Sequence, residues 1–279
     1  MILARTDDGY RFVTQPDHAR LAGQFADQWG NDRFGAPTPS PSVRIAAHTH
    51  DDGWWSYDRH PRLKADGTPY DFTELEAEPW IEHYEDGIET VVGVDRYAGL
   101  LVSMHGAGLR KRRYGLSPGW SETRAFGPFV DRQEELQGRL AAELSGTVVS
   151  EADRRLLSEL HDAGSPTDAP EGSQLWRNYR LMQAWDTLSL SFCASISPPA
   201  YGPIGSVPTQ PEEPDVTLRV EPVRGNDYRI DPYPFEVEPL EVTVPSRTVP
   251  RHSFESERSL IEAYYAADLE YDRFVMHHQ

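Results

Sequence analysis

Cysteine is almost missing from this 279-residue sequence, since Cys193 is the only one. One cysteine forms no intramolecular disulfide, and there is no cluster of thiolates for a zinc or iron–sulfur site. Long apolar runs are missing too: the best one, residues 97–104, is much shorter than the ~20 residues that a membrane helix needs. The first residues lack the long apolar segment of a secretory signal. We therefore expect no membrane partner and a cytoplasmic location.

Lysine is scarce, whereas acidic residues are abundant. Of the 27 basic residues only Lys64 and Lys111 are lysines, and 45 acidic residues bring the formal net charge to -18. Such a surface repels a phosphate backbone, which argues against binding of a nucleic-acid duplex. The composition favours a halophilic protein, whose carboxylates stay hydrated while salt screens their repulsion. An ordinary acidic protein from a GC-rich genome, which would also prefer arginine, is the alternative.

Helix signals dominate the first two hundred residues. Apolar periodicity and cap residues predict helices over residues 16–30, 40–53, 79–113, 128–144, 150–163 and 173–193. The Pro/Gly-rich segment 197–214 is typical of a linker. Beyond it, apolar and polar residues alternate over 216–220 and 240–244, which indicates strands. We therefore expect a mainly α protein, with a helical domain over residues 1–200 and a small β-rich C-terminal unit over residues 201–279.

Four of the predicted helices carry an ionisable residue on their apolar face. These residues are His18, His50, His105 and Asp186. A single inward histidine is more often a hydrogen-bonded core residue than a metal ligand. A carboxylate buried without a partner, however, costs several kcal/mol, so Asp186 needs a cation, a hydrogen-bond network or a metal. Because separate helices each bury such a residue, one shared site is favoured over unrelated causes.

A second carboxylate, Asp51, follows His50 directly, and imidazole with carboxylate is a ligand set suited to Mn, Fe, Ni or Zn rather than Ca. The ordered set of His18, the His50–Asp51 doublet and a distant Asp186 resembles the HD-domain superfamily of metal-dependent phosphohydrolases. Those are helical proteins in which a His, a His-Asp doublet and a later Asp bind one metal. The phrases QPDHARLAGQFADQWG, AAHTHDDGWWSYDRHP, LLVSMHGAGL and QAWDTLSLSFC also look like an uncharacterised family with this pattern.

The resemblance implies an HD-like multi-helix bundle with four metal ligands, namely His18, His50, Asp51 and Asp186. It places His105 where an auxiliary ligand or a general acid would come. The cofactor would be a divalent metal, Mn, Fe, Ni or Zn, as one ion or two. His48 and His83 are alternative ligands. Because the paired histidines of the two-metal members are not clearly reproduced, the number of ions stays open.

The resemblance also implies a reaction, the hydrolysis of a phosphoester or nucleotide by metal-bound hydroxide. A divalent metal lowers the pKa of bound water from 15.7 toward ~7 and polarises a phosphoryl oxygen. Asp51 or Asp186 would orient the water, and the basic run 110–113 would bind phosphoryl oxygens. A solvated helix end explains that run equally well. The predicted catalytic residues are Asp51, His105, Arg110 and Lys111.

Two other functions fit the same residues. A non-catalytic metal- or ligand-binding protein would keep the pocket without turnover, whereas a structural acidic protein would use its buried histidines only for hydrogen bonds. Metal content separates the structural protein from the other two, and hydrolysis of phosphoesters separates those two from each other. The expected partner is a small molecule, a phosphoester or nucleotide, whose identity depends on loops such as 55–79 that the sequence does not place.

Overall fold

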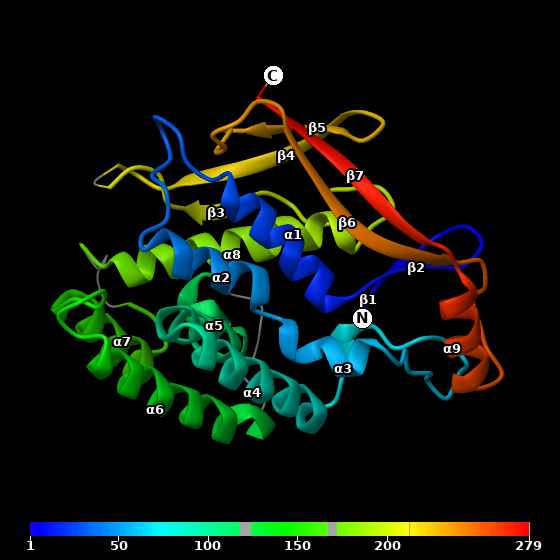
Figure 1. Cartoon of the computed structure of the whole chain (residues 1–279), viewed down its shortest axis with the longest axis horizontal. Coiled ribbons are helices and arrows are strands. Elements are labelled where there is room, and N and C mark those ends of the chain that lie inside the picture. The colour runs from blue at the N-terminus through cyan, green and yellow to red at the C-terminus, as the bar shows by residue number, and fades with distance from the viewer. Residues whose placement is uncertain (118–123, 167–171, 212, 279) are drawn as a thin grey trace.

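The computed structural model describes residues 1–117, 124–166, 172–211 and 213–278. Of the residues in these ranges, about 50% are helical and 19% lie in strands, which form a curled, mixed sheet of seven strands. The expectation of a mainly α protein with a small β-rich unit is therefore wrong. The protein has an α/β fold in which the sheet covers one side of the helices (Figure 1).

The sheet takes strands from both ends of the chain. Its order is β1-β2-β6-β7-β5-β4-β3, and all its neighbours are antiparallel except β5 and β7. The strands span Ile2–Arg5 (β1), Tyr10–Val13 (β2), Ile204–Val207 (β3), Val216–Arg224 (β4), Asp227–Asp231 (β5), Leu240–Val249 (β6) and Leu269–His277 (β7). The hairpin β1-β2, which the sequence analysis did not predict, pairs with β6 through Phe12 and Arg247. The sheet therefore crosses the expected boundary at residue 200.

The strand β3 lies inside the segment 197–214 that was expected to be a linker; residue 212 of that segment is outside the described ranges. This strand pairs only with β4 in the described sheet, and its register shifts between Ile204 and Val207. Edge strands tolerate such bulges and nearby prolines, since one side of the strand needs no partner. The segment is thus part of the folded body rather than a spacer.

The predicted helices appear close to their expected positions. The helices span Gln15–Asp27 (α1), Ser40–Thr49 (α2), Trp55–Asp58 (α3), Ala77–Val94 (α4), Arg96–Arg110 (α5), Gly127–Glu143 (α6), Glu151–Ala163 (α7), Gln174–Cys193 (α8) and Glu257–Ala266 (α9). The helix expected over residues 79–113 is two helices. Asp95 has an extended backbone, and its side chain accepts a hydrogen bond from Ala98 N at 2.8 Å, so it caps the start of α5.

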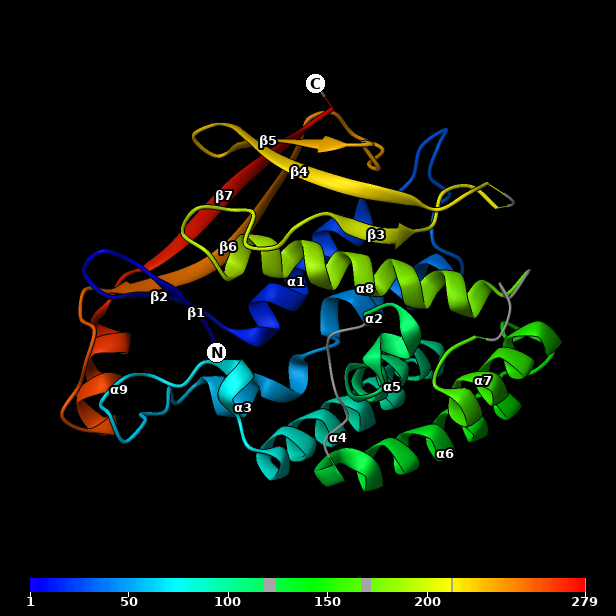
Figure 2. The ribbon, with the colours of Figure 1, turned by 180° about the vertical axis from the view of Figure 1, so that it is seen from behind.

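The helices form layers beneath the sheet. Figures 1 and 2 show α1 and α8 next to the strands, α2 and α5 below them, and α4, α6 and α7 on the outer side. α1 packs on β6 and α8 on β3, while α5 contacts α2, α4, α6 and α8. Every residue of α5 from Tyr97 to Gly108 is buried. The side chains of this central helix therefore contact those of several neighbouring helices.

An arginine ties the sheet to α8. Arg11 on β2 donates to the carbonyls of Phe192 and Cys193 at 2.8 and 2.7 Å and pairs with Asp272 on β7 at 3.0 Å. A cation at a helix C-terminus satisfies carbonyls that have no partner within the helix. The last turn of α8 is thus fixed against β2 and β7.

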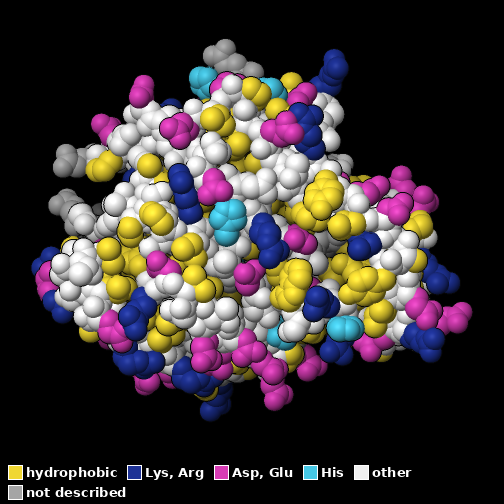
Figure 3. All heavy atoms as spheres, in the orientation of Figure 1, with side chains coloured by type: hydrophobic (Ala, Val, Ile, Leu, Met, Phe, Trp, Pro, Cys, Tyr) yellow, Lys and Arg dark blue, Asp and Glu magenta, His cyan; other side chains and the backbone are white. Residues whose placement is uncertain are grey.

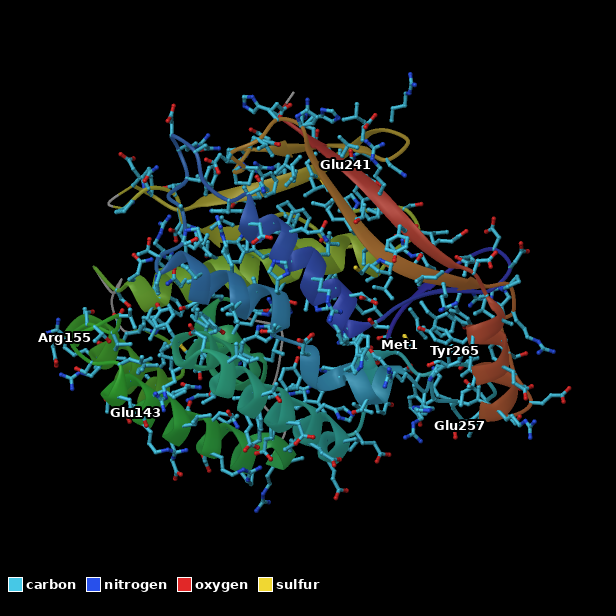
Figure 4. All side chains as sticks on the ribbon, in the orientation of Figure 1. Met1, Glu143, Arg155, Glu241, Glu257 and Tyr265 are labelled. Atoms are coloured by element: carbon cyan, nitrogen blue, oxygen red, sulfur yellow. The ribbon has the colours of Figure 1, made fainter. Side chains whose placement is uncertain are left out.

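Charged side chains cover the outside of the molecule. Figure 3 shows acidic and basic groups interspersed over one face, and Glu143, Arg155, Glu241 and Glu257 lie on the outer elements in Figure 4. The halophilic character inferred from the net charge of -18 remains a prediction. Within the described ranges, none of the helices has the length and apolar character that crossing a membrane would require.

Candidate metal centre

The five predicted metal ligands meet where α1, α2, α5 and α8 come together. His18 lies on α1, His50 and Asp51 follow the end of α2, His105 lies on α5 and Asp186 on α8. All five are at most 4% exposed. They form two overlapping groups, one of His18, His50 and Asp51 and the other of His50, His105 and Asp186, in which the ligand atoms lie within 4.8 Å of one another. The amphipathic faces thus converge as the sequence predicts.

His50 presents an unpartnered nitrogen to this volume. Its Nδ1 donates to the carbonyl of Ala47 at 2.9 Å, so the lone pair of the neutral ring is on Nε2. Nε2 is buried without a hydrogen bond, 3.5 Å from Asp186 Oδ1 and 3.9 Å from Asp51 Oδ2. An imidazole whose other nitrogen is bound to a backbone carbonyl is typical of a metal ligand.

His18 is oriented in the same way. Its Nδ1 lies 2.8 Å from Ser189 Oγ, and the hydroxyl proton of Ser189 is donated to the carbonyl of Asp186 at 2.9 Å. The oxygen of Ser189 therefore accepts a hydrogen bond from the Nδ1–H group, which leaves the lone pair of a neutral His18 on Nε2. That nitrogen faces Asp51 Oδ2 at 3.0 Å. Two acceptors at this distance repel each other unless a proton or a cation lies between them.

Each carboxylate is held on one side and directed inward on the other. Asp51 Oδ1 accepts a hydrogen bond from the hydroxyl of Tyr84 at 2.9 Å, and Asp186 Oδ2 accepts one from Arg113 at 2.9 Å. The second oxygens, Asp51 Oδ2 and Asp186 Oδ1, face the imidazoles of His18 and His50. The supported oxygens fix the positions of the inward ones.

The charges in the centre perturb each other strongly. Burial favours neutral His50, but the Asp51 and Asp186 carboxylates outweigh burial and raise its pKa to about 9. Burial opposes ionisation of Asp186 as well, yet the Arg113 guanidinium above all, then His50, holds the pKa of this carboxyl well below its usual range. In the ion-free protein a proton on His50 therefore balances the buried carboxylates near neutral pH.

His105 differs from the other two histidines. Burial lowers its pKa to about 4, so the ring is neutral. The amide nitrogen of Gln183 lies 3.0 Å from His105 Nδ1, while the amide oxygen of Gln183 is buried without a hydrogen-bond partner. If the Gln183 amide is turned by 180°, its oxygen accepts a hydrogen bond from the Nδ1–H group of His105. Nε2 of His105 is then available as a metal ligand. A neutral ring does not fit the expected role of general acid.

The two alternative histidines lie outside the centre. His48 Nε2 pairs with Asp27 at 3.0 Å, and the absent side chain of Gly23 makes room for it, because a Cβ there would lie 2.1 Å from His48 Nδ1. His83 packs against Trp54 and Tyr57 with ring centroids 5.3 and 4.9 Å apart. Neither histidine belongs to the two ligand groups.

The side chains of the basic run 110–113, at the end of α5, do not all face the same way. Arg112, Arg113 and Tyr114 have φ angles of 54°, 50° and 52°, a left-handed conformation that costs about 1–2 kcal/mol per residue. Lys111, which precedes them, donates to Glu134 and to the carbonyls of Leu160 and His161, none of which belongs to the ligand groups. The geometry gives no support to Lys111 as a catalytic residue.

Arg113 takes the place that was expected of its neighbours. Its guanidinium donates to Asp186 at 2.9 Å and to Thr187 at 3.0 Å. Arg110 instead stacks between two rings, 3.7 Å from the centroid of Trp80 and 3.6 Å from that of Phe126. Sequence reasoning saw the run but not which of its side chains turns toward the centre.

Three supporting residues were missed: Tyr84, Gln183 and Ser189. Two of them had a signal, because Gln183 and Ser189 lie three residues before and after Asp186 and hence on its helical face. Tyr84 on α4 contacts Asp51, which lies 33 residues earlier in the sequence. No local sequence pattern predicts a contact over that separation.

A family model described as "Protein of unknown function (DUF3891)" matches residues 1–251. The chain belongs to this family. The match includes all five residues of the centre and confirms the expected membership of an uncharacterised family. Neither a curated protein nor a solved structure matches the chain. The DUF3891 match gives no evidence for a relationship to HD-domain phosphohydrolases, so the resemblance stays a prediction and function is argued from the site.

In this DUF3891 protein a cavity of about 630 Å³ opens onto the centre. Its polar part includes His18, Asp51, His105 and Asp186, with Tyr84, Arg113 and Gln183 beside them. The rest of the lining mixes a few polar and charged side chains, Gln15, Thr73, Arg110, Ser117, Arg180, Thr187 and Ser206, with apolar and aromatic ones: Phe72, Leu75, Trp80, Leu109, Leu116, Phe126, Leu190, Tyr201 and Ile204. The size is that of a small-molecule site, and the combination of a few convergent polar groups with apolar walls is typical of one.

Proposed function

We propose that this DUF3891 protein binds one divalent transition-metal ion and hydrolyses a phosphoester in the adjoining cavity. The observation that carries the proposal is Nε2 of His50, a buried nitrogen without a hydrogen-bond partner that faces two carboxylate oxygens. A proton on this nitrogen has no hydrogen-bond partner among the described residues, whereas a cation would bind the nitrogen together with the oxygens of Asp51 and Asp186.

The donor atoms favour a single ion. Both ligand groups require His50, and its Nδ1 is already bound to Ala47, so only Nε2 is available. A neutral imidazole nitrogen binds one metal, and the two groups therefore compete for it. Three imidazoles with two carboxylates suit Mn, Fe, Ni or Zn, and the donor set contains no thiolate that would restrict the choice further.

The charges favour an anionic substrate. A divalent cation and the Arg113 guanidinium together exceed the charge of the Asp51 and Asp186 carboxylates, so the loaded centre is positive. In the described part of the cavity lining, these two are the only carboxylates. A phosphoryl group would thus meet positive charge at the centre and no repulsion from the described walls.

The residues of the chain have distinct roles in this proposal. The ion is held by His18, His50, Asp51 and Asp186. His105 is a further ligand when the amide oxygen of Gln183 accepts a hydrogen bond from its Nδ1–H group. The ion would supply an acidified water and polarise a phosphoryl oxygen. Arg113 binds the equatorial phosphoryl oxygens by charge-assisted hydrogen bonds. Tyr84 and Ser189 keep Asp51 and His18 in the orientation that the ion requires.

Metal content tests the binding step. Protein purified without chelator, or stripped and then reloaded, should contain about one equivalent of Mn, Fe, Ni or Zn by mass spectrometry. His50→Ala should lose this metal. His48→Ala is the matched control, because His48 lies two residues earlier and pairs with Asp27 instead. Absence of uptake in the wild type would overturn the proposal and favour purely structural histidines.

Turnover tests the second step. Metal-loaded wild type and His48→Ala should release phosphate from members of a panel of phosphomonoesters, cyclic nucleotides and nucleoside triphosphates. His50→Ala should not. A protein that binds one equivalent of metal and hydrolyses nothing in the panel would instead be a non-catalytic metal- or ligand-binding protein.

A further inference from the structure

The cavity is much larger than a phosphate group. A volume of about 630 Å³ lies within the range of sites that enclose a whole drug-sized ligand. The described lining residues include only five that would hold the metal or the phosphate, namely His18, Asp51, His105, Asp186 and Arg113. Most of the space would therefore receive the organic part of a substrate, and the walls there determine which organic part fits.

Several apolar side chains of the walls are left partly in contact with solvent. Phe72, Leu75, Leu109 and Leu116 are half-buried, and Tyr201 is 43% exposed. Apolar surface of this kind, gathered in a concave site, gains free energy when a ligand removes it from water. Sugars and polyols would not gain in this way, because their hydroxyls need hydrogen-bond partners.

One wall is an aromatic row that starts at the centre. Tyr84, which donates to Asp51, has its ring centroid 4.0 Å from that of Trp80. Arg110 lies over the other rings of the row, Trp80 and Phe126, with its guanidinium carbon 3.7 and 3.6 Å from their centroids. Trp80 and Phe126 also meet edge to face at 5.2 Å. These three rings are at most 6% exposed and contact one another and Arg110, so the row is a fixed wall of the cavity rather than a free stacking surface.

The cations are arranged for one phosphate rather than a chain of them. Arg113 is next to the metal ligands, whereas Arg180 is ion-paired with Asp215 and Arg110 is held between its two rings. A polyphosphate needs further cations or backbone donors along its length. The described lining contains no lysine or arginine besides these three.

From these features we infer that the cavity binds a phosphate monoester of an apolar, ring-containing alcohol, with the phosphate at the metal and Arg113 and the ring against Tyr201 and the half-buried apolar side chains. The inference rests on the proposed function for the position of the phosphate. The choice of ring over polyol or polyphosphate rests on the walls alone.

Equilibrium binding tests the inference without turnover. The probes are 1-naphthylmethylphosphonate, which is not hydrolysed, inorganic phosphate and pyrophosphate, each titrated calorimetrically into the metal-loaded full chain. The naphthyl phosphonate should bind at least tenfold more tightly than the other two. Equal affinities, or tighter binding of pyrophosphate, would overturn the inference.

Wall variants locate the ring. Tyr201→Ser should weaken the naphthyl phosphonate by about three- to tenfold, since an aromatic contact of ordinary strength is lost. Its affinity for inorganic phosphate should not change. Tyr271→Ser is the control, because Tyr271 is 66% exposed on β7 and does not line the cavity. An equal effect of the two variants would contradict the placement of the ring.

A hydrolysis assay separates this inference from the proposed function. Preference for 1-naphthyl phosphate over glycerol 2-phosphate supports both. Tight binding of the naphthyl ligand without hydrolysis of any phosphoester would remove the proposed function and leave the ligand class standing. Hydrolysis of both esters at equal efficiency would leave the function and overturn the ligand class.

Discussion

Two buried aspartates at opposite parts of α8 have very different surroundings. Asp153, on α7, contacts the start of α8 and accepts four hydrogen bonds, from Ser150 N and Oγ, Ser173 Oγ and Leu175 N, all between 2.7 and 2.9 Å. Asp186, within α8, accepts one from Arg113 and faces imidazole nitrogens with its other oxygen, at 3.5 Å from His50 and 3.8 Å from His18.

Burial does not separate these two residues, because Asp153 is 1% exposed and Asp186 is 3% exposed. The two residues differ in the hydrogen-bond donors that surround each carboxylate. Asp153 has a full set of neutral donors and connects two helices, so it stabilises the fold without any ion. Around Asp186 a carboxylate oxygen faces imidazole nitrogens, an arrangement that needs a proton or a metal ion between them. A complete hydrogen-bond account of each buried group thus distinguishes a structural aspartate from a candidate ligand.

The largest expected effect is the loss of metal affinity when Asp186, but not Asp153, is replaced by asparagine. Asp186→Asn should weaken metal binding by well over the ~100-fold that loss of a supporting residue costs, because it removes a ligand charge. Asp153→Asn should change metal affinity less than twofold. Calorimetric titration of the stripped proteins measures both. Similar losses in the two variants would show that the comparison has no functional meaning.

The pH dependence of metal binding is the next largest effect. The carboxylates raise the pKa of His50 from 6.5 to about 9, so its proton stabilises the ion-free fold below pH 6.5 and that contribution is lost as pH rises through about 9. The metal must displace the same proton. Metal affinity should therefore rise by up to about tenfold per pH unit over this interval. Titrations at pH 6.5, 7.5 and 8.5 measure the slope, and a flat profile would contradict a protonated His50.

Gly53, which follows the His50–Asp51 doublet, tests how closely the turn that carries Asp51 packs against α4. A Cβ on Gly53 would lie 1.9 Å from the carbonyl oxygen of His83, so Gly53→Ala must push α4 away from the turn that carries Asp51. We expect a loss of about 3 kcal/mol in the free energy of unfolding, together with weaker metal binding. Chemical denaturation measures the first quantity.

Gly93→Ala is the matched control for that variant, since nothing lies within 4 Å of a Cβ at this position in α4. It should raise the free energy of unfolding by about 0.5–1 kcal/mol, because alanine restricts the unfolded chain. A stable, metal-binding Gly53→Ala protein would contradict the close packing of the turn.

A smaller effect than that of Gly53→Ala is expected at the structural aspartate itself. Asp153→Ala removes the N3 side chain of the Ser150 capping box at the start of α7 and leaves Leu175 N without its partner, which should cost about 2 kcal/mol. The metal content of the folded fraction should stay at one equivalent. Urea denaturation and metal analysis of the same sample test both statements, and loss of metal at unchanged stability would reverse the roles assigned to the two aspartates.

The helical part of the site could be predicted because amphipathic spacing is local. His18, His105 and Asp186 each lie on an apolar stripe that can be read within one helix, and burial follows from the stripe. The sheet was underestimated for the opposite reason. β1 and β2 have four residues each, and β2 pairs with β6, more than 230 positions away, where no local pattern can indicate the partner.

The basic run shows a second limit. Residue types 110–113 are all cationic, so their sequence gives no reason to separate Lys111 from Arg113. The separation comes from three left-handed residues, a conformation that intrinsic preference disfavours and tertiary contacts impose. Buried Tyr114, packed against Tyr179 at 5.6 Å, is one of those contacts.

Anomalous diffraction from crystals of the protein purified without chelator tests the central claim most directly. Data collected above and below the absorption edge of the metal found in solution should give one peak, about 2.0–2.3 Å from His50 Nε2 and from inward oxygens of Asp51 and Asp186. Crystals without a peak after soaking in that metal, with His50 Nε2 bonded only to a carboxylate, would contradict the account.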